Sequence, residues 1–578
     1  MDTIQISIDG IEVQVPKGAT VLETANTLGI HIPTLCYAKG INHSSSCRVC
    51  LVEVGPRLIA SCTLVAEDGM KIQTNTAKVR NARKTTVELL LSDHNQECPT
   101  CGRSGQCELQ DISQQLNLRE VRYTGEKSKT LVDFSSPAIV RDTSKCILCG
   151  RCAGVCDNLQ TVHAIGFSGR GFNTLIAPAY DLPLGESLCI NCGQCIMACP
   201  VGALQEKESI GDVWRAIADP NQYVVVQTAP AVRVALGEEF GLPMGTRVTG
   251  KMVAALRRMG FDQVFDTDFA ADLTIMEEGT ELLTRFDSGE NLPLMTSCCP
   301  GWVKFVEHNF PDMLNLLSTC KSPHEMEGAM IKNYFAEKME IDPKRIVVVS
   351  IMPCTAKKFE GQRDELSNHD LQDVDYVLTT RELAKMIKEA GIDFNKLQGE
   401  TFDNPFGEGS GAGIIFGATG GVAEAALRTV FELVAGEELE TIDYKVVRGM
   451  EGIKEARVEL PNGAVIRTAV VHGLGHAREL MEQIRSGAKS YDFIEVMACS
   501  GGCIMGGGQP IVDARTQGEM NVKLERAKAI YAEDKSLPIR KSHKNPDIIK
   551  IYEEYLEHPN SHKSHELLHT HYIRRNKF

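Results

Sequence analysis

Cysteine is the residue type that dominates the chemistry available to this chain. The sequence of 578 residues contains 21 cysteines, and most of them stand in groups with short, regular gaps. Thiolates grouped in this way bind iron or zinc, whereas disulfide scaffolds are typical of short secreted chains. The grouping therefore predicts a protein that holds several metal centres.

The most specific group is a four-cysteine pattern, C-x2-C-x2-C-x3-C, that occurs twice. The copies consist of Cys146, Cys149, Cys152 and Cys156, and of Cys189, Cys192, Cys195 and Cys199. This is the bacterial two-cluster ferredoxin pattern, in which the fourth cysteine of each copy ligates the other cluster. We therefore expect two [4Fe–4S] clusters with exchanged fourth ligands. Their predicted ligands are Cys146, Cys149, Cys152 and Cys199 for one cluster, and Cys189, Cys192, Cys195 and Cys156 for the other.

An earlier group has the composition of a [2Fe–2S] site. Cys36, Cys47, Cys50 and Cys62 are separated by gaps of ten, two and eleven residues. The first gap is longer than the gap of about four residues in plant-type ferredoxins. The segment Ile4–Val15 alternates around Asp9-Gly10, which indicates a hairpin. We expect the four thiolates to lie on loops at one end of a small β-grasp sheet and to hold two irons.

A third group combines one histidine with three cysteines. His94, Cys98, Cys101 and Cys107 follow a helical stretch at 81–91. Spacing alone leaves zinc and iron open here, because three cysteines and one histidine are an ordinary zinc set.

The remaining cysteines stand at the ends of apolar runs in the C-terminal half. The runs 292–299, 347–354 and 494–499 end on Cys299, Cys354 and Cys499, and Cys503 follows. Ligand sites in parallel sheets lie at the carboxyl ends of the strands. Four thiols at strand ends therefore predict one more metal site. Cys298 and Cys320 then lie outside every predicted ligand group, and Cys320 is interpreted as a small buried hydrophobic residue.

The elements that would position these thiols follow an alternating strand–helix pattern. The expected strands are 223–227, 263–265, 345–350, 376–378 and 493–497, and the expected helices include 250–259, 381–390 and 422–434. Such alternation indicates an α/β domain with parallel sheets in two lobes and helices on both faces. The predicted domains are 1–78 for the [2Fe–2S] site, 79–125 for the His/Cys3 site, 138–209 for the two-cluster ferredoxin and 210–578 for the large domain that contains the strand-end thiols, with a C-terminal helical tail.

Composition narrows the classes of function. A net charge of −15 disfavours nucleic acid and anionic membrane surfaces as partners. No apolar run approaches the roughly 20 residues of a membrane span, and Met1-Asp2-Thr3-Ile4 does not begin a signal peptide. We expect a cytoplasmic iron–sulfur protein.

Three C-terminal segments resemble the signature segments of the [FeFe] hydrogenases. They are 296–302 (TSCCPGW), 352–358 (MPCTAKK) and 495–508 (EVMACSGGCIMGGG), and the N-terminal groups are similar to those of the same family and of the large iron–sulfur subunit of respiratory complex I. The resemblance implies that the His94 group holds a third accessory [4Fe–4S] cluster. It also implies that Cys299, Cys354, Cys499 and Cys503 hold the [4Fe–4S] part of an H-cluster. Cys503 would bridge it to a di-iron unit with CO, cyanide and dithiolate ligands.

The resemblance also implies a pocket around the di-iron unit. Lys357 would donate to a cyanide ligand, although a solvated lysine is the alternative. Ala231 and His324 stand where the family more often has Ser and Gln. The implied wall residues are Ala229, Pro230, Met352, Phe416, Gly417 and Met497. The glycine-rich stretch 411–421 lacks the spacing of a dinucleotide site, and we expect it to allow close approach to the cofactor.

A buried site needs a route for protons. Glu278 and Glu281 are three residues apart and would share one helix face. The resemblance implies a chain from Cys298 through Glu278, Ser318 and Glu281, with Arg285 near the exit. An ordinary salt bridge is the other reading of the Glu281–Arg285 spacing.

The predicted function is reversible hydrogen oxidation and proton reduction, with electrons passing to ferredoxin or to an NAD(P)H-linked partner. The latter version requires a flavoprotein subunit and a small [2Fe–2S] subunit, and the family needs maturation proteins to assemble the di-iron unit. The alternatives are a hydrogen sensor or iron–sulfur assembly relative without turnover, and an electron-transfer subunit of complex I type.

Overall fold

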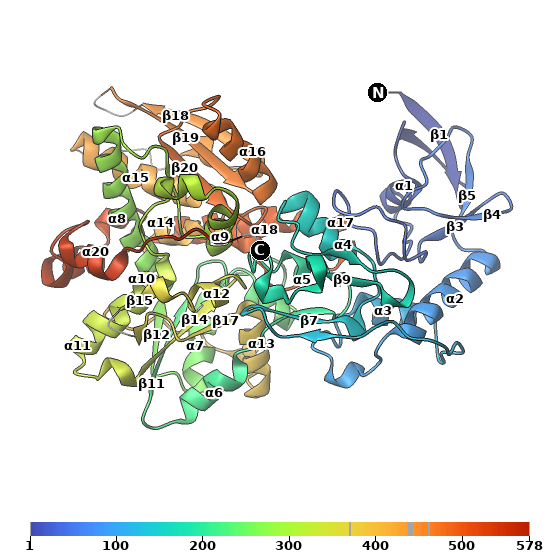
Figure 1. Ribbon diagram of the computed structural model, residues 1–578, viewed down its shortest axis with the longest axis horizontal. Helices are drawn as coiled ribbons and strands as arrows, with labels where there is room; N and C mark the ends of the chain where they lie inside the picture. Colours follow the sequence, from blue (N-terminus) through green and yellow to red (C-terminus); the bar gives the residue numbers. More distant parts are fainter. Residues whose placement is uncertain are drawn as a thin grey trace.

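The computed structural model describes residues 2–368, 371–407, 409–436, 438, 443–459 and 463–576. Figure 1 shows an elongated molecule. The chain runs from a small N-terminal sheet, through a cysteine-rich middle section, into a large C-terminal body that contains two sheets.

The N-terminal sheet has five strands in the order β2-β1-β5-β3-β4. They are β1 Thr3–Ile8, β2 Ile11–Pro16, β3 Leu51–Val54, β4 Arg57–Ala60 and β5 Lys71–Gln73, and helix α1 spans Val21–Thr27. Strands β1 and β2 form the expected hairpin, whose turn residues Asp9 and Gly10 have φ angles of 51° and 87°. Left-handed values at both positions match the twist of the flanking strands. The predicted hairpin is confirmed.

The middle section packs short elements around the repeated cysteine pattern. Its helices and strands are α2 Ala77–Asp93, α3 Glu108–Gln115, β6 Val132–Asp133, β7 Ile139–Asp142, α4 Arg151–Gly154, β8 Gly166–Ser168, β9 Leu175–Ala177, α5 Gln194–Ala198 and β10 Leu204–Glu206. Gly150 and Gly193 precede α4 and α5 with φ of 77° and 69°. The two cysteine repeats thus share one local backbone geometry, which a residue with a side chain adopts only at a cost.

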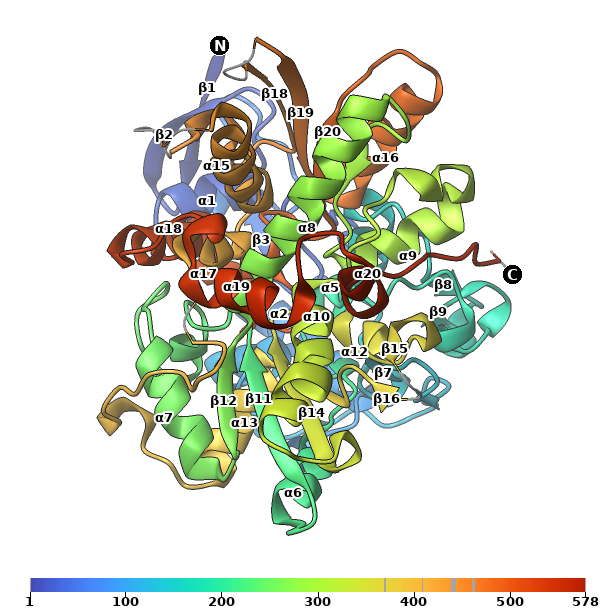
Figure 2. The same cartoon turned by 90° about the vertical axis from the view of Figure 1, so that its left-hand side faces the viewer.

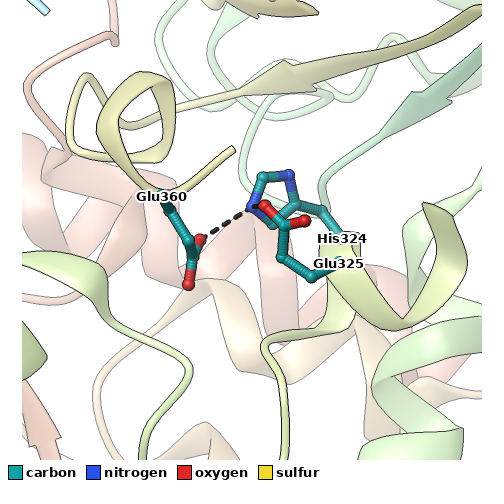
Figure 3. Close-up of side chains that lie close together, drawn as sticks. All are labelled: His324, Glu325 and Glu360. Atoms are coloured by element: carbon teal, nitrogen blue, oxygen red, sulfur yellow. Dashed lines mark hydrogen bonds and ion pairs between the residues drawn. The ribbon is translucent and has the colours of Figure 1, made fainter. Parts of the chain in front are cut away.

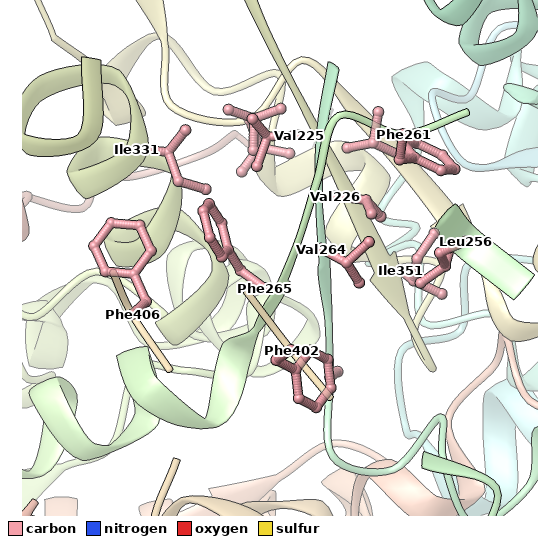
Figure 4. Packing of buried hydrophobic residues seen from close by; sticks show 14 of the residues in the cluster. Val225, Val226, Leu256, Phe261, Val264, Phe265, Ile331, Ile351, Phe402 and Phe406 are labelled. Carbon is pink, nitrogen blue, oxygen red and sulfur yellow. The ribbon is translucent and has the colours of Figure 1, made fainter. Parts of the chain in front are cut away.

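The first sheet of the C-terminal body is entirely parallel, with the strand order β12-β11-β14-β17. Its strands are β11 Tyr223–Thr228, β12 Gln263–Asp266, β14 Ile346–Met352 and β17 Tyr376–Thr379. Val225 and Val226 are fully buried. Figure 4 shows them packed in an apolar cluster with Phe265 and Ile351. A strand that is buried on both faces requires such a run of β-branched residues. This run is the feature that predicted strand β11 from the sequence.

The second sheet has the order β13-β20-β19-β18. Its strands are β13 Leu294–Met295, β18 Ile453–Glu459, β19 Val465–His472 and β20 Phe493–Met497. β13 and β19 run parallel to β20, but β18 is antiparallel to β19, so the expectation of parallel strands is wrong at this edge. The link between β18 and β19 is too short for the crossover that parallel pairing needs.

Helices surround both sheets in Figure 2. The helices are α6 Ile210–Ala218, α7 Thr249–Met259, α8 Thr267–Ser288, α9 Pro300–Asn309, α10 Pro323–Met330, α11 Ala336–Lys338, α12 Lys357–Glu360, α13 Thr380–Glu389, α14 Gly411–Ile414, α15 Gly421–Ala435, α16 Leu474–Arg485, α17 Ala514–Glu519, α18 Val522–Ser536, α19 Pro546–Ile551 and α20 His562–Leu568. The C-terminal helices α19 and α20 lie beside α8 and α10 in Figure 2. The three predicted helices correspond to α7, α13 and α15. Among the described residues, no helix has the length and apolar character to cross a bilayer.

Candidate metal centres and active site

The strand ends of both sheets bring four thiols to one place. Cys299 follows β13 and begins α9, Cys354 follows β14, and Cys499 follows β20. Burial raises the pKa of Cys503, and the nearby Cys299 and Cys354 raise it further. Burial likewise raises the pKa of Cys354 to about 12, with Cys299 contributing. Burial also raises the pKa of Cys499, with Cys354 and Cys299 contributing. The described structure therefore places the four predicted thiols together in a site enclosed by protein.

The chemistry of this donor set fits an iron–sulfur cluster. The four enclosed thiols oppose one another's ionisation, because each negative charge raises the pKa of the others. A bound metal ion stabilises them as thiolates. Thiolates are soft ligands, and they favour iron–sulfur clusters among other metal centres. The backbone around them is also built for close approach. A Cβ on Gly506 would overlap the carbonyl of Pro353, and one on Gly508 would lie 2.9 Å from the side chain of Thr379. Glycine is therefore required at both positions.

Lys357 is the buried cation next to the four thiols. Its Nζ donates to the Cys298 carbonyl at 3.1 Å, to Ser322 Oγ at 2.8 Å and to Glu360 Oε2 at 2.6 Å. Burial alone would lower the pKa of Lys357, but the charge of Glu360 outweighs burial and the pKa is raised. Lys357 is therefore a fixed cation rather than a solvated side chain.

His324 lies close to the carboxylates of Glu325 and Glu360, as Figure 3 shows, and Glu360 is the carboxylate that contacts Lys357. His324 Nε2 is 2.7 Å from Glu360 Oε2 and 3.0 Å from Glu325 Oε1. Burial and Lys357 act to lower the pKa of His324, but the two glutamates outweigh them and raise it. The three side chains are close enough to hold a metal ion. However, Lys357 and His324 already supply the positive charge that Glu360 needs, so the group is an ion-pair network.

The residues implied as pocket walls lie at the ends of both sheets. Ala229 and Met352 are buried at the ends of β11 and β14, in the core of the first sheet. Phe416 and Met497 are buried in a second core that also contacts Cys298 and Cys503. Pro230 is buried between Ala229 and Ala231, and a Cβ on Gly417 would lie 3.4 Å from the Ala231 nitrogen.

The glycine-rich stretch serves mainly to pack protein against protein. A Cβ on Gly413, like one on Gly409 just before the stretch, would overlap the backbone of Asp268 in α8, and one on Gly421 would overlap the Ile415 carbonyl. The expected close approach to a cofactor stays a prediction, with Phe416 and Gly417 as the wall residues. Only Gly417 faces the Ala229–Ala231 segment.

The ferredoxin-like section contains two cavities that divide the eight cysteines. One is lined by Cys146, Cys149, Cys152 and Cys199, and the other by Cys156, Cys189, Cys192 and Cys195. Each fourth cysteine of the repeat lies with the other three, as the spacing predicts. Besides their thiols, both cavities are lined mainly by apolar side chains, which suits two separate [4Fe–4S] clusters.

The two N-terminal groups are also assembled around buried ligand atoms. Cys36 contacts Cys47 and Cys62, and Cys62 contacts Cys50, and all four are buried. Burial lowers the pKa of His94, so its imidazole is neutral, and its buried Nδ1 has no hydrogen-bond partner in the described part of the chain. Cys101 and Cys107 are close enough for the charge of one to act on the other. A buried neutral imidazole nitrogen without a hydrogen-bond partner is suited to ligation.

The second ferredoxin cavity directly adjoins the four-thiol site. Gln194 Nε2 donates to Cys499 Sγ at 3.2 Å and to the Met505 carbonyl at 2.9 Å. A Cβ on Gly507 would overlap the Cys192 carbonyl. Arg381 in α13 forms a buried ion pair with Glu206 of β10 at 2.8 Å. These contacts hold the two sites together, and they include residues that the sequence did not single out.

Three of the predicted proton-route residues, Glu278, Glu281 and Arg285, lie on α8, and Ser318 and Cys298 lie close to them. Ser318 Oγ donates to Glu281 Oε2 at 2.8 Å, and Arg285 Nη2 is 2.5 Å from Glu281 Oε1. Burial raises the pKa of Glu278 to about 8, and the charge of Glu281 adds to this while a hydrogen bond from Ser318 opposes it. Burial also raises the pKa of Cys298, with Glu278 contributing. The five side chains are close together, and the i,i+4 salt bridge exists as well.

Several side chains that complete these sites were missed. Glu360, three residues after Lys357 on α12, had an available signal in the helical spacing. No sequence signal indicated Thr319, which contacts Glu281, or His569, which contacts Thr319. The contact between Thr319 and His569 joins residues 250 positions apart.

Family models cover most of the chain. The matches are to the iron only hydrogenase large subunit, C-terminal domain (222–507), the iron hydrogenase small subunit (520–575), a 2Fe-2S iron-sulfur cluster binding domain (1–77), the NADH-ubiquinone oxidoreductase-G iron-sulfur binding region (83–122) and a 4Fe-4S binding domain (183–205).

Individual relatives agree with the family models. The chain is 51% identical to the NADP-reducing hydrogenase subunit HndD of Solidesulfovibrio fructosivorans, covering 100% of both chains. It is 42% identical to iron hydrogenase 1 of Clostridium pasteurianum, covering 98% of this chain and 99% of that one. A solved structure of a variant of the [FeFe]-hydrogenase HydA1 from Chlamydomonas reinhardtii is 43% identical with a TM-score of 0.57, covering 63% of this chain and 98% of that one. The chain therefore belongs to the [FeFe] hydrogenases, which catalyse hydrogen oxidation and proton reduction and relay the electrons through iron–sulfur clusters.

Proposed function

We propose that this chain is the hydrogen-activating subunit of a multi-subunit, NAD(P)H-linked [FeFe] hydrogenase. The observation that carries the proposal is its 51% identity, over the whole length of both chains, to a subunit of an NADP-reducing hydrogenase. The chain's own glycine-rich stretch packs against α8, which supports a nucleotide site elsewhere. The cofactor would then be reduced or oxidised on a flavoprotein partner, with a small [2Fe–2S] subunit between them.

In this proposal Cys299, Cys354, Cys499 and Cys503 hold the H-cluster, with Cys503 as the bridging thiolate. When bound, the H-cluster supplies the metal at which hydrogen is split or formed. Lys357 contributes a fixed positive charge beside the anionic ligands of the cluster. The apolar wall of Ala229, Pro230, Met352, Phe416, Gly417 and Met497 excludes water, which strengthens the charge interactions inside. The network of His324, Glu325 and Glu360 keeps Lys357 charged and oriented.

Electrons would move through one [2Fe–2S] and three accessory [4Fe–4S] clusters. The cavity of Cys156, Cys189, Cys192 and Cys195 is the neighbour of the H-cluster site, so its cluster is the proposed last donor. Protons would move between Cys298, Glu278, Ser318 and Glu281. The raised pKa of Glu278, about 8, lets this carboxyl gain and lose a proton near neutral pH.

The partner assignment predicts a division of activities. The purified, matured chain should reduce an artificial viologen dye or ferredoxin with hydrogen, but should not reduce NAD⁺ or NADP⁺. Adding a flavoprotein subunit and a small [2Fe–2S] subunit of an NADP-reducing hydrogenase should establish that reduction. Hydrogen-dependent formation of NAD(P)H, followed by its absorbance, measures this. Full reduction by the chain alone would overturn the partner assignment but not the hydrogenase activity.

A further inference from the structure

Glu281 needs a connection to solvent that Arg285 does not provide. A guanidinium stays protonated at every pH the protein meets, so it cannot pass protons on. Both terminal nitrogens of Arg285 are also engaged: Nη2 bonds Glu281 and the Leu317 carbonyl, and Nη1 bonds the carbonyls of Asn291 and Asn315. Arg285 therefore orients Glu281, and the proton must leave by another group.

Thr319 and His569 lie on the other side of the same carboxylate. Thr319 Oγ1 is 3.4 Å from Glu281 Oε1 and 2.8 Å from His569 Nδ1. Ser318 and Thr319 thus place one hydroxyl on each side of Glu281, Ser318 towards Glu278 and Thr319 towards His569. A hydroxyl both donates and accepts, so it can pass a proton between two titratable groups.

The backbone fixes His569 in this position. Residues 319–321 pair with 568–570 through bonds from the Thr570 nitrogen to the Thr319 carbonyl at 2.7 Å and from the Lys321 nitrogen to the Leu568 carbonyl at 2.8 Å. Helix α20, which precedes His569, lies beside α10 (Figure 2). His569 is 8% exposed, so it lies just beneath the surface.

His569 contacts a buried carboxylate on one side and an exposed histidine on the other. Its Nε2 is 3.3 Å from Glu277 Oε2, and Glu277 is itself held by Tyr552 at 2.6 Å. The ring of exposed His565 packs on the His569 ring with the centroids 4.1 Å apart. The titratable groups in contact with His569 are thus Glu277 from α8 and His565 from α20. Glu281 is reached through Thr319, and Tyr552 through Glu277.

We propose that His569 and Thr319 form the outer end of the proton route. A proton taken up from solvent by His569 is donated from Nδ1 to Thr319 Oγ1, whose own proton moves to Glu281. The reverse sequence releases a proton during hydrogen oxidation. The inference rests on the proposed proton role of Glu281. It also gives a function to the 520–575 segment that matches the iron hydrogenase small subunit, because His569 belongs to that segment.

The test uses the matured full chain with variants that keep shape but remove proton transfer. Thr319→Val removes the hydroxyl, His569→Gln keeps a polar side chain without a titratable ring, and His569→Ala opens space for a small base. Each should lower turnover in both directions by about tenfold to 10³-fold. His571→Gln, an exposed histidine of the same segment, is the matched control and should retain wild-type turnover.

Two readouts separate proton transfer from structural damage. Added imidazole should restore at least part of the turnover of His569→Ala but not that of Thr319→Val. Time-resolved infrared spectra after a pH jump should show slower changes of the carboxyl C=O band in both variants. The CO and cyanide bands should stay unchanged.

The outcomes distinguish this inference from the function on which it rests. If Glu281→Gln collapses turnover while Thr319→Val and His569→Gln retain wild-type rates, only the His569 exit is overturned. If Glu281→Gln also retains full turnover, the proposed proton chain is wrong. Loss of turnover without imidazole rescue, with shifted CO and cyanide bands, would overturn the relay by showing a structural effect.

Discussion

Replacing Cys298 by alanine is expected to lower hydrogen turnover by about two to four orders of magnitude, the range by which a positioned acid–base group accelerates a reaction. The thiol lies beside the four cluster thiols, and burial and the nearby Glu278 raise its pKa. Lys357 donates to the backbone carbonyl of residue 298, which alanine retains. Iron content and the infrared bands of CO and cyanide should therefore persist, and hydrogen assays with a viologen dye measure the loss.

Cys320→Ala is the matched control for this change. Cys320 is a buried cysteine that also lies outside the predicted ligand groups, 3.9 Å from Glu281 Oε2. Its removal should leave turnover within a few-fold of wild type. Equal losses in the two variants, or full activity of Cys298→Ala, would contradict the proton role of Cys298.

Replacing Glu278 by glutamine is expected to have opposite effects on activity and stability. Turnover should fall by about 10²-fold to 10⁴-fold, because glutamine cannot accept the proton. The pKa of Glu278 is raised from 4.5 to about 8 by burial first and by Glu281 second. The folded state thus keeps this proton over a pH range in which the unfolded state loses it. The free energy of unfolding consequently falls as the pH rises from about 4.5 to 8.

The glutamine variant removes this pH-dependent cost. It should raise the free energy of unfolding by about 3 kcal/mol at pH 7 and by less than about 1 kcal/mol at pH 5. Thermal unfolding at the two pH values measures the difference. Glu327→Gln is a suitable control, because burial and Asp266 also raise the pKa of Glu327 while it lies outside the proton chain. It should gain stability and keep its turnover; a loss equal to that of Glu278→Gln would contradict the specific role of Glu278.

Local features of this protein could be read from its sequence. The exchange of Cys156 and Cys199 between the ferredoxin cavities follows from spacing, because two short repeats constrain which thiols can meet. The buried strands β11 and β14 were identifiable because a parallel sheet covered on both faces needs unbroken β-branched runs. The antiparallel direction of β18 could not be predicted from the sequence, because its pairing with β19 depends on a link of ordinary composition.

Long-range contacts between polar side chains could not be predicted. The sequence suggested a possible salt bridge between Glu281 and Arg285, which are one helical turn apart. It did not indicate that Thr319 meets His569, or that His324 from α10 reaches Glu360 of α12. Such contacts depend on how whole helices dock. The glycine-rich stretch shows the same limit, since its composition requires close approach but does not say to what.

The central claim is that four thiols from two sheets hold an H-cluster bridged by Cys503. Infrared spectroscopy of the matured wild-type chain and of Cys503→Ala tests it most directly. The wild-type protein should show CO and cyanide stretching bands and evolve hydrogen. Cys503→Ala should retain the iron of the accessory clusters and lose both the bands and the activity. Full-strength bands in Cys503→Ala, or hydrogen evolution by wild-type protein that has no such bands, would contradict the claim.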